Sequence, residues 1–448
     1  ESLWQRKRSI MKTLGIVKET KNKWERRVPL NPSAVKELIR KGFEVIIQPS
    51  NNRIYKNEEY RSVGAKLSEN LSRCDFIIGV KEIPMDVLIP EKPHLFFSHT
   101  IKGQDYNMPL LQKILDEKIT LFDYEKIEDE KNRRLVFFGK FAGNAGMVDT
   151  LHGLGQRLKQ QYNLKTPFLK IKHSYEYESV QDAIEHLKII GKEIEENGLP
   201  KEITPLNIFL LGYGHVAVGC QEILAALPIV EIHPDKLAEH SQNYDDNKIY
   251  LSVFKEEHLV ERKDGGKFSL PDYFENNSAY KSRLEQYLPY CSVYMNAIYW
   301  TPECPVFLPN SYLKTIQDEK PKLIIIGDIT CDIAGSVQAT VKETSPDNPV
   351  FVYDPKSEKE TDGYEGEGFA VMAVDNLPCE FPREASDTFS NSLKPFMEKI
   401  LLNDYSQSIE KSDLPEEIKK ACIAHQGKLQ PDFEYLGEYL AAKNTKDR

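Results

Sequence analysis

A glycine-rich turn near the middle of the chain constrains the fold most. The apolar run 206–211 leads directly into a G-x-G-x-x-A pattern, and a helical pattern continues to Leu227. Glycine permits the sharp turn and lets the backbone approach a phosphate without a Cβ in the way. The following helix offers unpaired N–H groups and a positive dipole end to a pyrophosphate. This order predicts a dinucleotide site, and a turn that binds nothing is the alternative. The predicted cofactor contacts are Gly212, Gly214, His215, Val216 and Ala217.

Length and charge favour a multidomain enzyme. The 448 residues exceed a single hydrophobic core, and 40% of them are hydrophobic. The net charge of −10, without a long block of either sign, argues against nucleic acid as a partner. No apolar run approaches the ~18 residues of a membrane span, so we expect no membrane partner. The seven scattered cysteines lack a C-x-x-C pair, which predicts a reducing compartment, no disulfide framework and no metal site.

Residues 1–10 precede Met11, which has the character of a natural start. We expect these ten residues to be a short extension outside the fold. The basic patch Arg6-Lys7-Arg8 also fits part of a transit peptide, although ten residues are few for one.

Short apolar runs alternate with helical patterns in two parts of the chain, and this alternation predicts parallel α/β sheets. The charged stretch 234–290 predicts an irregular insertion. The expected fold class is α/β, with two Rossmann-like, doubly wound parallel-sheet domains and an active-site cleft between them. The expected parts are a substrate domain over 11–150 completed by 376–448, connecting helices over 151–204, and a dinucleotide-binding domain over 205–375.

Polar residues at strand ends extend the predicted cofactor site. Two buried strands of the second domain are followed by Asn296-Ala297 and by Asp328-Ile-Thr330. In doubly wound sheets the ligand lies at this carboxyl edge. The run 229–233 is expected to be the second strand of that sheet, with Glu231 inside it and His233 at its end. Because histidine does not repel a 2′-phosphate as a carboxylate would, His233 favours NADP(H), and NAD(H) is the alternative.

Titratable residues follow several strands of the first domain. Lys81 and Glu82 come directly after the apolar run 76–80, and His99 follows 95–97. Each residue alone fits a solvated loop charge, but the carboxyl ends of parallel strands converge on one crevice. Such a crevice can hold substrate carboxylates and supply an acid/base pair. The candidate residues are Arg27, Lys81, Glu82, His99, Lys102, Glu125 and Arg134.

Several long motifs resemble a known superfamily. The segment from Val17 to Pro32 resembles the opening of the alanine dehydrogenase/transhydrogenase and saccharopine dehydrogenase superfamily. A second set of motifs is similar, more narrowly, to the lysine–ketoglutarate reductase half of aminoadipic semialdehyde synthases. These motifs are Gly79–Glu82, Phe97–Lys102, Phe122–Glu125, Phe138–Gly146, Met295–Trp300 and Asp375–Pro378. The similarity runs from about residue 15 to about residue 435.

The resemblance implies reductive condensation of L-lysine with 2-oxoglutarate to saccharopine, in lysine degradation, with NADP(H) favoured. It implies that Lys81 and His99 are the acid/base pair and that Glu82 tunes the neighbouring lysine. It also implies that Arg27, Lys102, Glu125 and Arg134 line the substrate site. In that family a glutamate-forming saccharopine dehydrogenase acts next, and the location is cytoplasmic or, in an animal, the mitochondrial matrix. A homo-oligomer is compatible with the resemblance.

Three alternatives remain at this point. An NAD-dependent, lysine-forming saccharopine dehydrogenase runs the same chemistry in reverse. An alanine dehydrogenase-like enzyme uses pyruvate and ammonia, but the extra segments 163–204 and 234–290 argue against it. A non-catalytic dinucleotide sensor is expected to lack Lys81 or His99, and both are present.

Overall fold

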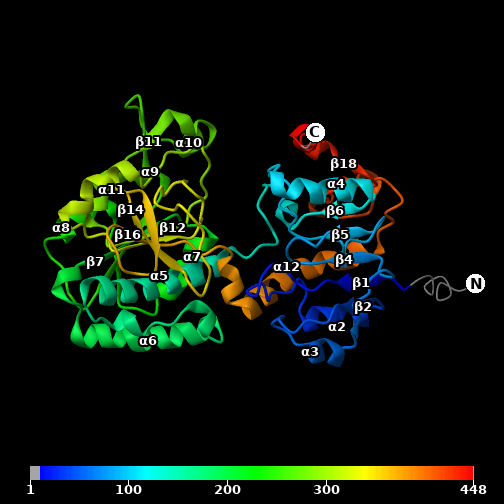
Figure 1. The fold of residues 1–448 in the computed structure, drawn as a ribbon, viewed down its shortest axis with the longest axis horizontal. Helices are drawn as coiled ribbons and strands as arrows, with labels where there is room; N and C mark the ends of the chain where they lie inside the picture. The colour runs from blue at the N-terminus through cyan, green and yellow to red at the C-terminus, as the bar shows by residue number, and fades with distance from the viewer. Residues whose placement is uncertain (1–10, 447–448) are drawn as a thin grey trace, which may run out of the picture. The chain divides into compact units, whose positions relative to one another are not determined.

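The computed structural model describes residues 11–446, so the extension predicted over residues 1–10 lies outside the described residues. The described chain divides into two compact units (Figure 1). Unit 1 comprises the residues up to Phe138 and those from Pro382 onward, and unit 2 is Gly139–Phe381.

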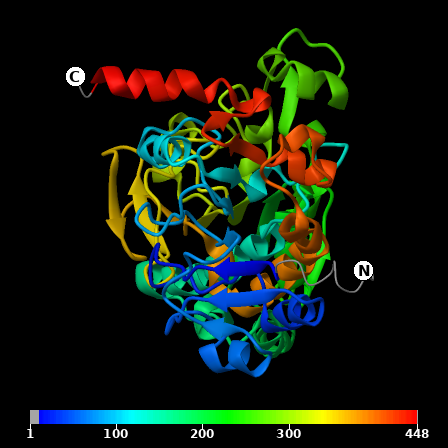
Figure 2. The ribbon, with the colours of Figure 1, turned by 90° about the vertical axis from the view of Figure 1, so that its right-hand side faces the viewer.

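Unit 1 is an α/β unit whose last elements come from the carboxyl-terminal part of the chain. Figure 2 shows its final helix, α14, as a single straight rod. Its helices and strands are β1 (Thr13–Ile16), α2 (Pro32–Arg40), β2 (Glu44–Ile47), α3 (Asn57–Ser62), β3 (Lys66–Leu67), β4 (Phe76–Ile78), β5 (Pro93–Leu95), α4 (Met108–Asp116), β6 (Thr120–Phe122), α12 (Pro382–Leu402), α13 (Glu416–Lys420), β17 (Cys422–His425), β18 (Lys428–Leu429) and α14 (Leu436–Lys446).

The described part of unit 1 contains one eight-stranded sheet in the order β18-β17-β6-β5-β4-β1-β2-β3. The strands from β6 to β3 are parallel, and β17 and β18 add an antiparallel edge. Chain order therefore runs outward in both directions from the β1–β4 pair. Ile77 of β4, Leu121 of β6 and Leu111 of α4 are fully buried in its core.

Unit 2 carries the predicted dinucleotide turn. Its helices and strands are α5 (Gly139–Tyr162), α6 (Val180–Asn197), β7 (Leu206–Leu211), α7 (His215–Leu224), β8 (Ile229–Glu231), α8 (Leu237–His240), β9 (Ile249–Phe254), α9 (Glu256–Leu259), β10 (Val260–Arg262), α10 (Leu270–Glu275), β11 (Tyr280–Ser282), β12 (Val293–Asn296), α11 (Asn310–Ile316), β13 (Ile325–Asp328), β14 (Val350–Asp354), β15 (Lys359–Asp362) and β16 (Phe369–Met372).

Within the described residues of unit 2, eight strands form a sheet in the order β15-β14-β16-β13-β12-β7-β9-β8. The strands from β8 to β16 are parallel, while β14 pairs antiparallel with both β16 and β15. Here chain order reverses at the β7–β12 pair. Two mostly parallel sheets with helices confirm the predicted class of two Rossmann-like domains.

The structure corrects the prediction that 234–290 is only an irregular insertion. Ile249–Phe254 forms β9, which is buried and pairs with β7 along its whole length. Its β-branched and aromatic residues favour a strand, but the surrounding charges concealed it in the sequence. The short strand β8 lies outside β9 at the edge of the sheet.

The unit boundaries also differ from the predicted ones at 150 and 376. Helix α5 and the segment 163–204 both belong to unit 2. The reason is close packing of α5 against α7. A Cβ on Gly143 of α5 would lie 1.9 Å from the Val216 carbonyl oxygen, and one on Gly219 of α7 would lie 2.0 Å from that of Lys140. The two backbones therefore touch where these glycines meet.

Among the described residues, no helix combines the length and apolar character that crossing a membrane requires.

The α5–α7 contact gives a stability prediction. We expect Gly143→Ala to destabilise unit 2 by about 3 kcal/mol, because the added methyl would overlap backbone and not a flexible side chain. The measurement is the thermal midpoint of unfolding. Gly437→Ala is the control, since nothing lies within 4 Å of its Cβ position. An unchanged midpoint for the α5 variant would contradict this account of the packing.

Candidate active site

The candidate catalytic residues gather at the carboxyl edge of the unit 1 sheet. Lys81 and Glu82 follow β4, His99 follows β5, and Glu125 follows β6. These strands are neighbours in the order β6-β5-β4-β1. The edge includes the β1–β4 pair, where chain order reverses, and such a point is where open α/β sheets form their ligand crevices.

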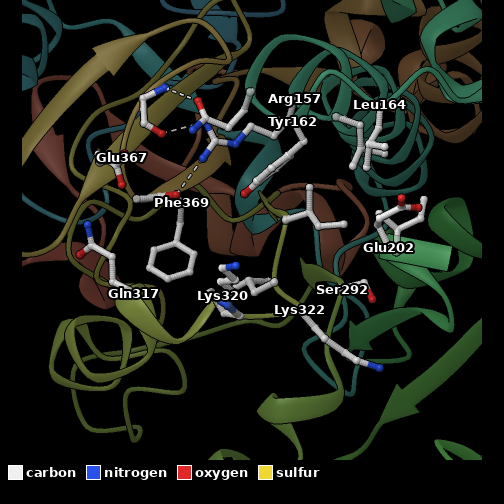
Figure 3. A pocket seen from close by; sticks show the side chains of 18 of the residues that line it. Arg157, Tyr162, Leu164, Glu202, Ser292, Gln317, Lys320, Lys322, Glu367 and Phe369 are labelled. Atoms are coloured by element: carbon white, nitrogen blue, oxygen red, sulfur yellow. Dashed lines mark hydrogen bonds between the residues drawn. The ribbon is translucent and has the colours of Figure 1, made fainter. Parts of the chain in front are cut away.

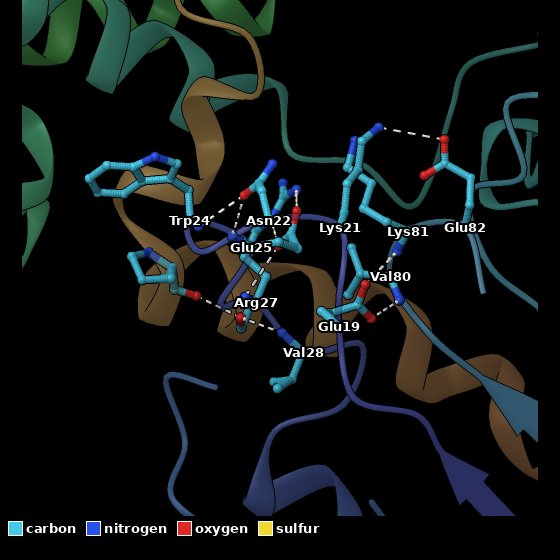
Figure 4. Close-up of polar contacts among 12 residues, drawn as sticks. Glu19, Lys21, Asn22, Trp24, Glu25, Arg27, Val28, Val80, Lys81 and Glu82 are labelled. Atoms are coloured by element: carbon cyan, nitrogen blue, oxygen red, sulfur yellow. Dashed lines mark hydrogen bonds and ion pairs between the residues drawn. The ribbon is translucent and has the colours of Figure 1, made fainter. Parts of the chain in front are cut away.

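Glu19 bridges this reversal point (Figure 4). It follows β1, and its two carboxyl oxygens accept hydrogen bonds from the backbone N–H groups of Val80, at 2.6 Å, and Lys81, at 3.0 Å. Burial and the nearby charge of Glu25 raise the pKa of Glu19. The carboxyl group therefore fixes the backbone that carries Lys81. Glu19 has no predicted role, although its place just beyond a strand is the same signal that identified Lys81.

Arg27 is buried in an ion pair with Glu25. Its Nη2 lies 2.6 Å from Glu25 Oε2, and its Nε donates to Oε1 at 2.8 Å. The guanidinium also lies over the Phe138 ring, 4.1 Å from the ring centre. A buried arginine held by a carboxylate at its edge and by a ring over one face has a fixed orientation. The predicted substrate contact is thus a preorganised cation whose charge Glu25 already balances.

Glu82 and His99 form a direct pair. Glu82 Oε1 lies 2.6 Å from His99 Nδ1 and 3.5 Å from Lys21 Nζ. Burial alone would raise the pKa of Glu82, but the hydrogen bond and charge of His99, together with Lys21, lower it to about 2. Glu82 is therefore ionised at neutral pH. With Nδ1 engaged, Nε2 is the ring nitrogen left for proton exchange with a substrate.

The backbone of His99 is held in an uncommon conformation. Its φ is +50°, in the left-handed region that a residue with a Cβ rarely adopts. Its carbonyl accepts a hydrogen bond from Asn107 Nδ2 at 3.1 Å, and its ring stacks on Phe97. Strain of this kind persists where surrounding contacts over-determine it, often at functional sites.

Asp123, a residue without a predicted role, supports the same loop from β6. Its carboxylate accepts from Ser98 N at 2.8 Å, from Ser98 Oγ at 2.5 Å and from Glu125 N at 2.8 Å. Burial, and then the charge of Glu125, raise the pKa of Asp123 to about 6. Asp123 thus ties Ser98, the residue before His99, to the backbone of Glu125.

The remaining unit 1 candidates are more exposed. Arg134 Nη2 lies 3.5 Å from Glu125 Oε2. Lys102 is exposed on the loop after His99. These side chains are placed to meet a charged ligand from solvent, in contrast to buried Arg27.

In unit 2 the glycine turn fits a dinucleotide. Gly212 has a φ of +101°, and a Cβ there would come within 2.8 Å of the Ala297 carbonyl oxygen. Nothing lies within 4 Å of the Cβ position of Gly214. Helix α7 begins at His215 with Gly214 as its N-cap, and glycine has no side chain to occupy the first N–H groups. His215 is exposed, whereas Val216 and Ala217 turn toward the packed side.

A cavity of about 560 Å³ opens beside this turn. It is lined by Gly212, Gly214 and Ala297 from the predicted set. Phe254, at the end of β9, and Glu256, just after it, also line the cavity. The volume lies in the range of small-molecule and cofactor sites. The turn and the carboxyl ends of β7 and β12 therefore form one concave surface.

Asn296, Asp328 and Thr330 form a buried network at the neighbouring strand ends. Asn296 Nδ2 lies 2.8 Å from Asp328 Oδ1 and 2.8 Å from Thr330 Oγ1, and Thr340 Oγ1 donates to Asp328 Oδ2. Burial raises the pKa of Asp328. Because these groups bond mainly to one another, they hold the ends of β12 and β13 in register.

The structure places Glu231 on the edge strand β8, and His233 comes just after that strand. Glu231 pairs with Leu251 of β9, which in turn pairs with Ile208 of β7. Glu231 thus lies on the edge strand, three residues short of the carboxyl end of β7. The strand beside β7 is β9, and its end is followed by Lys255 and Glu256. The inference from His233 assumed that β8 lies beside β7, whereas the structure places β9 between these two strands.

Tyr213 of the glycine turn reaches this corrected strand end. Its hydroxyl donates to Glu256 Oε2 at 3.1 Å, and Lys255 Nζ lies 5.9 Å from the Tyr213 ring centre. One cation and one carboxylate therefore stand where an adenosine ribose is held in such folds. Within the described residues, no group of three or more His, Cys, Asp or Glu side chains is arranged for a metal ion.

Family models match both units. The alanine dehydrogenase/PNT N-terminal domain matches residues 15–145, and the C-terminal domain of the same family matches residues 198–431. The chain belongs to the alanine dehydrogenase/PNT family of nicotinamide-dependent dehydrogenases and is an NAD(P)-dependent oxidoreductase. The predicted superfamily is confirmed.

Three curated relatives show which proteins within this family the chain is similar to. An alpha-aminoadipic semialdehyde synthase of Arabidopsis thaliana is 40% identical over 442 residues, covering 94% of this chain and 41% of the relative. A mitochondrial protein of the same name from Bos taurus is 35% identical, covering 94% of this chain and 47% of its own length. The saccharopine dehydrogenase [NAD(+), L-lysine-forming] of Candida glabrata is 26% identical, and the match covers 87% of this chain and 91% of the relative. The chain thus spans less than half the length of the first two relatives.

Solved structures agree on the fold. An L-alanine dehydrogenase matches with a TM-score of 0.60 at 18% identity, covering 96% of this chain and 99% of that one. A transhydrogenase from Sinorhizobium meliloti gives 0.55 at 12% identity, covering 94% and 100%. At these identities the likeness establishes the fold alone.

The Glu82–His99 pair gives a pH-dependent prediction. The pKa of Glu82 is about 2 in the folded protein against an ordinary 4.5, so its stabilising contribution is present above about pH 4.5 and is lost as the pH falls toward 2. Glu82→Gln should therefore destabilise the protein by about 1–2 kcal/mol at pH 7 and by progressively less below pH 4.5. Thermal midpoints across this range are the measurement. Glu69→Gln, which removes an exposed partner of Lys18, is the control. A deficit independent of pH would contradict the ionised pair.

Proposed function

We propose that the chain is a lysine–2-oxoglutarate reductase, which condenses L-lysine with 2-oxoglutarate and reduces the product to saccharopine. The observation that carries this proposal is the meeting of Lys81, Glu82 and His99 at one reversal point, with Glu19 bonded to the Lys81 backbone. The similarity to aminoadipic semialdehyde synthases and to a lysine-forming saccharopine dehydrogenase supports this substrate class. That the active site lies between the two domains stays a prediction.

The proposed chemistry assigns one proton transfer to each of two side chains. Lys81 accepts a proton from the ε-ammonium of the substrate lysine, so that the amine can attack the ketone carbon of 2-oxoglutarate. His99 donates one proton to the oxygen of that ketone and the attacking nitrogen gives up a second, so that the oxygen leaves as water while a carbon–nitrogen double bond forms. A bound nicotinamide cofactor supplies the hydride for its reduction. The Glu82 carboxylate stabilises the protonated imidazole through Nδ1.

Basic residues around the edge suit the carboxylates of both substrates. Exposed Lys102 and half-exposed Arg134 are proposed as direct carboxylate contacts. Arg27 is proposed as a substrate contact of fixed orientation, because Glu25 and Phe138 hold its guanidinium. Glu125, paired with Arg134, orients that cation. A separate glutamate-forming saccharopine dehydrogenase is the proposed consumer of the product.

Lys255 and Glu256 are proposed to set the choice of cofactor. A carboxylate at the end of the strand beside the glycine turn accepts hydrogen bonds from a free ribose 2′-hydroxyl, which favours NAD(H). A neighbouring lysine pairs with a 2′-phosphate, which favours NADP(H). The resemblance to the reductase family favours NADP(H), so we propose that Lys255 is the phosphate contact.

Substrate and catalytic roles can be tested together. With NADPH or NADH present, we expect rapid cofactor oxidation with L-lysine plus 2-oxoglutarate. Lys81→Met should lower turnover at least about 100-fold, since it removes an acid/base group, and should leave NADPH affinity unchanged. Lys36→Met, on the exposed side of α2, is the matched control. Turnover only with pyruvate and ammonia would overturn the substrate assignment. No turnover with either pair, with NADPH still bound, would indicate a sensor.

Cofactor choice has its own test. The ratio of kcat/KM for NADPH to that for NADH should rise about tenfold in Glu256→Gln, because a repulsive carboxylate is removed. The same ratio should fall in Lys255→Gln, because a phosphate partner is lost. Glu257→Gln, exposed and adjacent, is the control. Equal ratios in all three variants would show that neither Lys255 nor Glu256 sets the choice of cofactor.

A further inference from the structure

Unit 2 has a second cavity, of about 490 Å³, that the proposed reaction does not use (Figure 3). Its walls come from the carboxyl half of α5, the loop before β7, and the segments that lead into β12, β13 and β16. Ser292, Ile324 and Phe369 mark the amino-terminal ends of those last three strands.

This position separates the cavity from the cofactor turn. Parallel strands have one amino edge and one carboxyl edge, and the glycine turn follows the carboxyl end of β7. Strands of four to six residues separate the edges by about 13–20 Å. A molecule in the second cavity therefore contacts none of the residues at the glycine turn.

Arg157 builds one wall of the cavity. Its Nη1 donates to the carbonyl oxygens of Tyr364, at 2.7 Å, and Gly366, at 3.1 Å, and its Nη2 donates to that of Gly368 at 2.9 Å. Gln161 Oε1 accepts from Gly366 N at 2.9 Å. Four hydrogen bonds thus hold the 364–368 loop against α5, and the wall exists before any ligand arrives.

Arg157 also has an unused donor. Its side chain is 1% exposed, and its buried Nε has no hydrogen-bond partner within the described residues. A buried polar group without a partner is unfavourable, and this nitrogen is also shielded from solvent, so it is not part of the cavity surface.

The charged residues that line the cavity favour a ligand with a single negative charge. Lys320 and Lys322 lie on the segment leading into β13, and burial lowers the pKa of Lys322. Exposed Glu202 and Glu367 also line the cavity, which disfavours a ligand with several negative charges. Much of the remaining lining is apolar or aromatic, including Leu158, Leu164, Ile203 and Phe369. Figure 3 shows the Tyr162 ring projecting from α5 into this space.

We propose that this cavity is a separate binding site for a small amphipathic monocarboxylate. Lys320 and Lys322 bind its carboxylate, and the apolar side chains of α5 and Phe369 hold a body of about the size of an aromatic ring. This proposal does not depend on the proposed reaction, because binding at the cavity is measured directly and not through turnover.

The test is calorimetric titration of the full chain, saturated with NADPH, with 3-phenylpropionate, hexanoate and benzoate. The uncharged amide 3-phenylpropionamide is the ligand control. At least one carboxylate should bind, the phenylpropionate at least 10-fold more tightly than its amide, and omission of NADPH should leave the affinity unchanged. Equal affinity for acid and amide, competition with NADPH, or no binding by any carboxylate would overturn the proposal.

Variants locate the bound molecule. Lys320→Gln with Lys322→Gln should weaken carboxylate binding at least 10-fold. Lys201→Gln with Lys314→Gln, two exposed lysines outside the lining, makes the same change in net charge and should alter it less than twofold. Leu164→Trp should abolish binding by filling the cavity while the NADPH affinity stays unchanged. Equal effects of the two lysine pairs, or full binding by the tryptophan variant, would place the ligand elsewhere.

Discussion

The reversal of strand order within each parallel sheet is the constraint on which the candidate sites depend. In unit 1 it lies between β1 and β4, and in unit 2 between β7 and β12. At each point the loops leave in opposite directions and open a crevice at the carboxyl edge. Glu19 spans the first crevice by bonding to Val80 and Lys81. At the second, Gly212 lies against the Ala297 carbonyl, a contact that only a residue without a Cβ permits.

Buried charge gives the unit 1 edge its chemical character. Glu25, Arg27 and Asp123 are almost inaccessible to solvent, and burial of charge is unfavourable unless it is paired or hydrogen-bonded. Glu25 and Arg27 pair with each other, and the Asp123 carboxylate accepts a hydrogen bond from the backbone of Ser98, the residue before His99. Lys81, Glu82 and His99 themselves remain partly exposed. The edge thus combines rigid support with side chains that a substrate can reach, which preorganised catalysis requires.

Sequence periodicity predicted this edge well and the cofactor edge less well. Lys81, His99 and Glu125 each follow a strand of the parallel sheet in space, so the rule that strand ends converge placed them correctly. The same rule failed at Glu231 and His233, because it assumed that strands consecutive in sequence are neighbours in the sheet. β9, inside a charged stretch, takes the place beside β7. Glu19 and Asp123 were missed because their roles depend on backbone N–H groups that sequence patterns do not reveal.

The sequence by itself determined the fold class, the glycine turn and the residues at the strand ends, since local periodicity and backbone geometry encode these features. It also carried the long motifs that identify the family. Only the tertiary structure decided which strands are neighbours, that α5 packs into unit 2 through Gly143 and Gly219, and that Glu19 holds the Lys81 backbone. It alone revealed the cavity behind Arg157. These features join residues tens to hundreds of positions apart, and such contacts depend on packing and hydrogen bonding that no local pattern records.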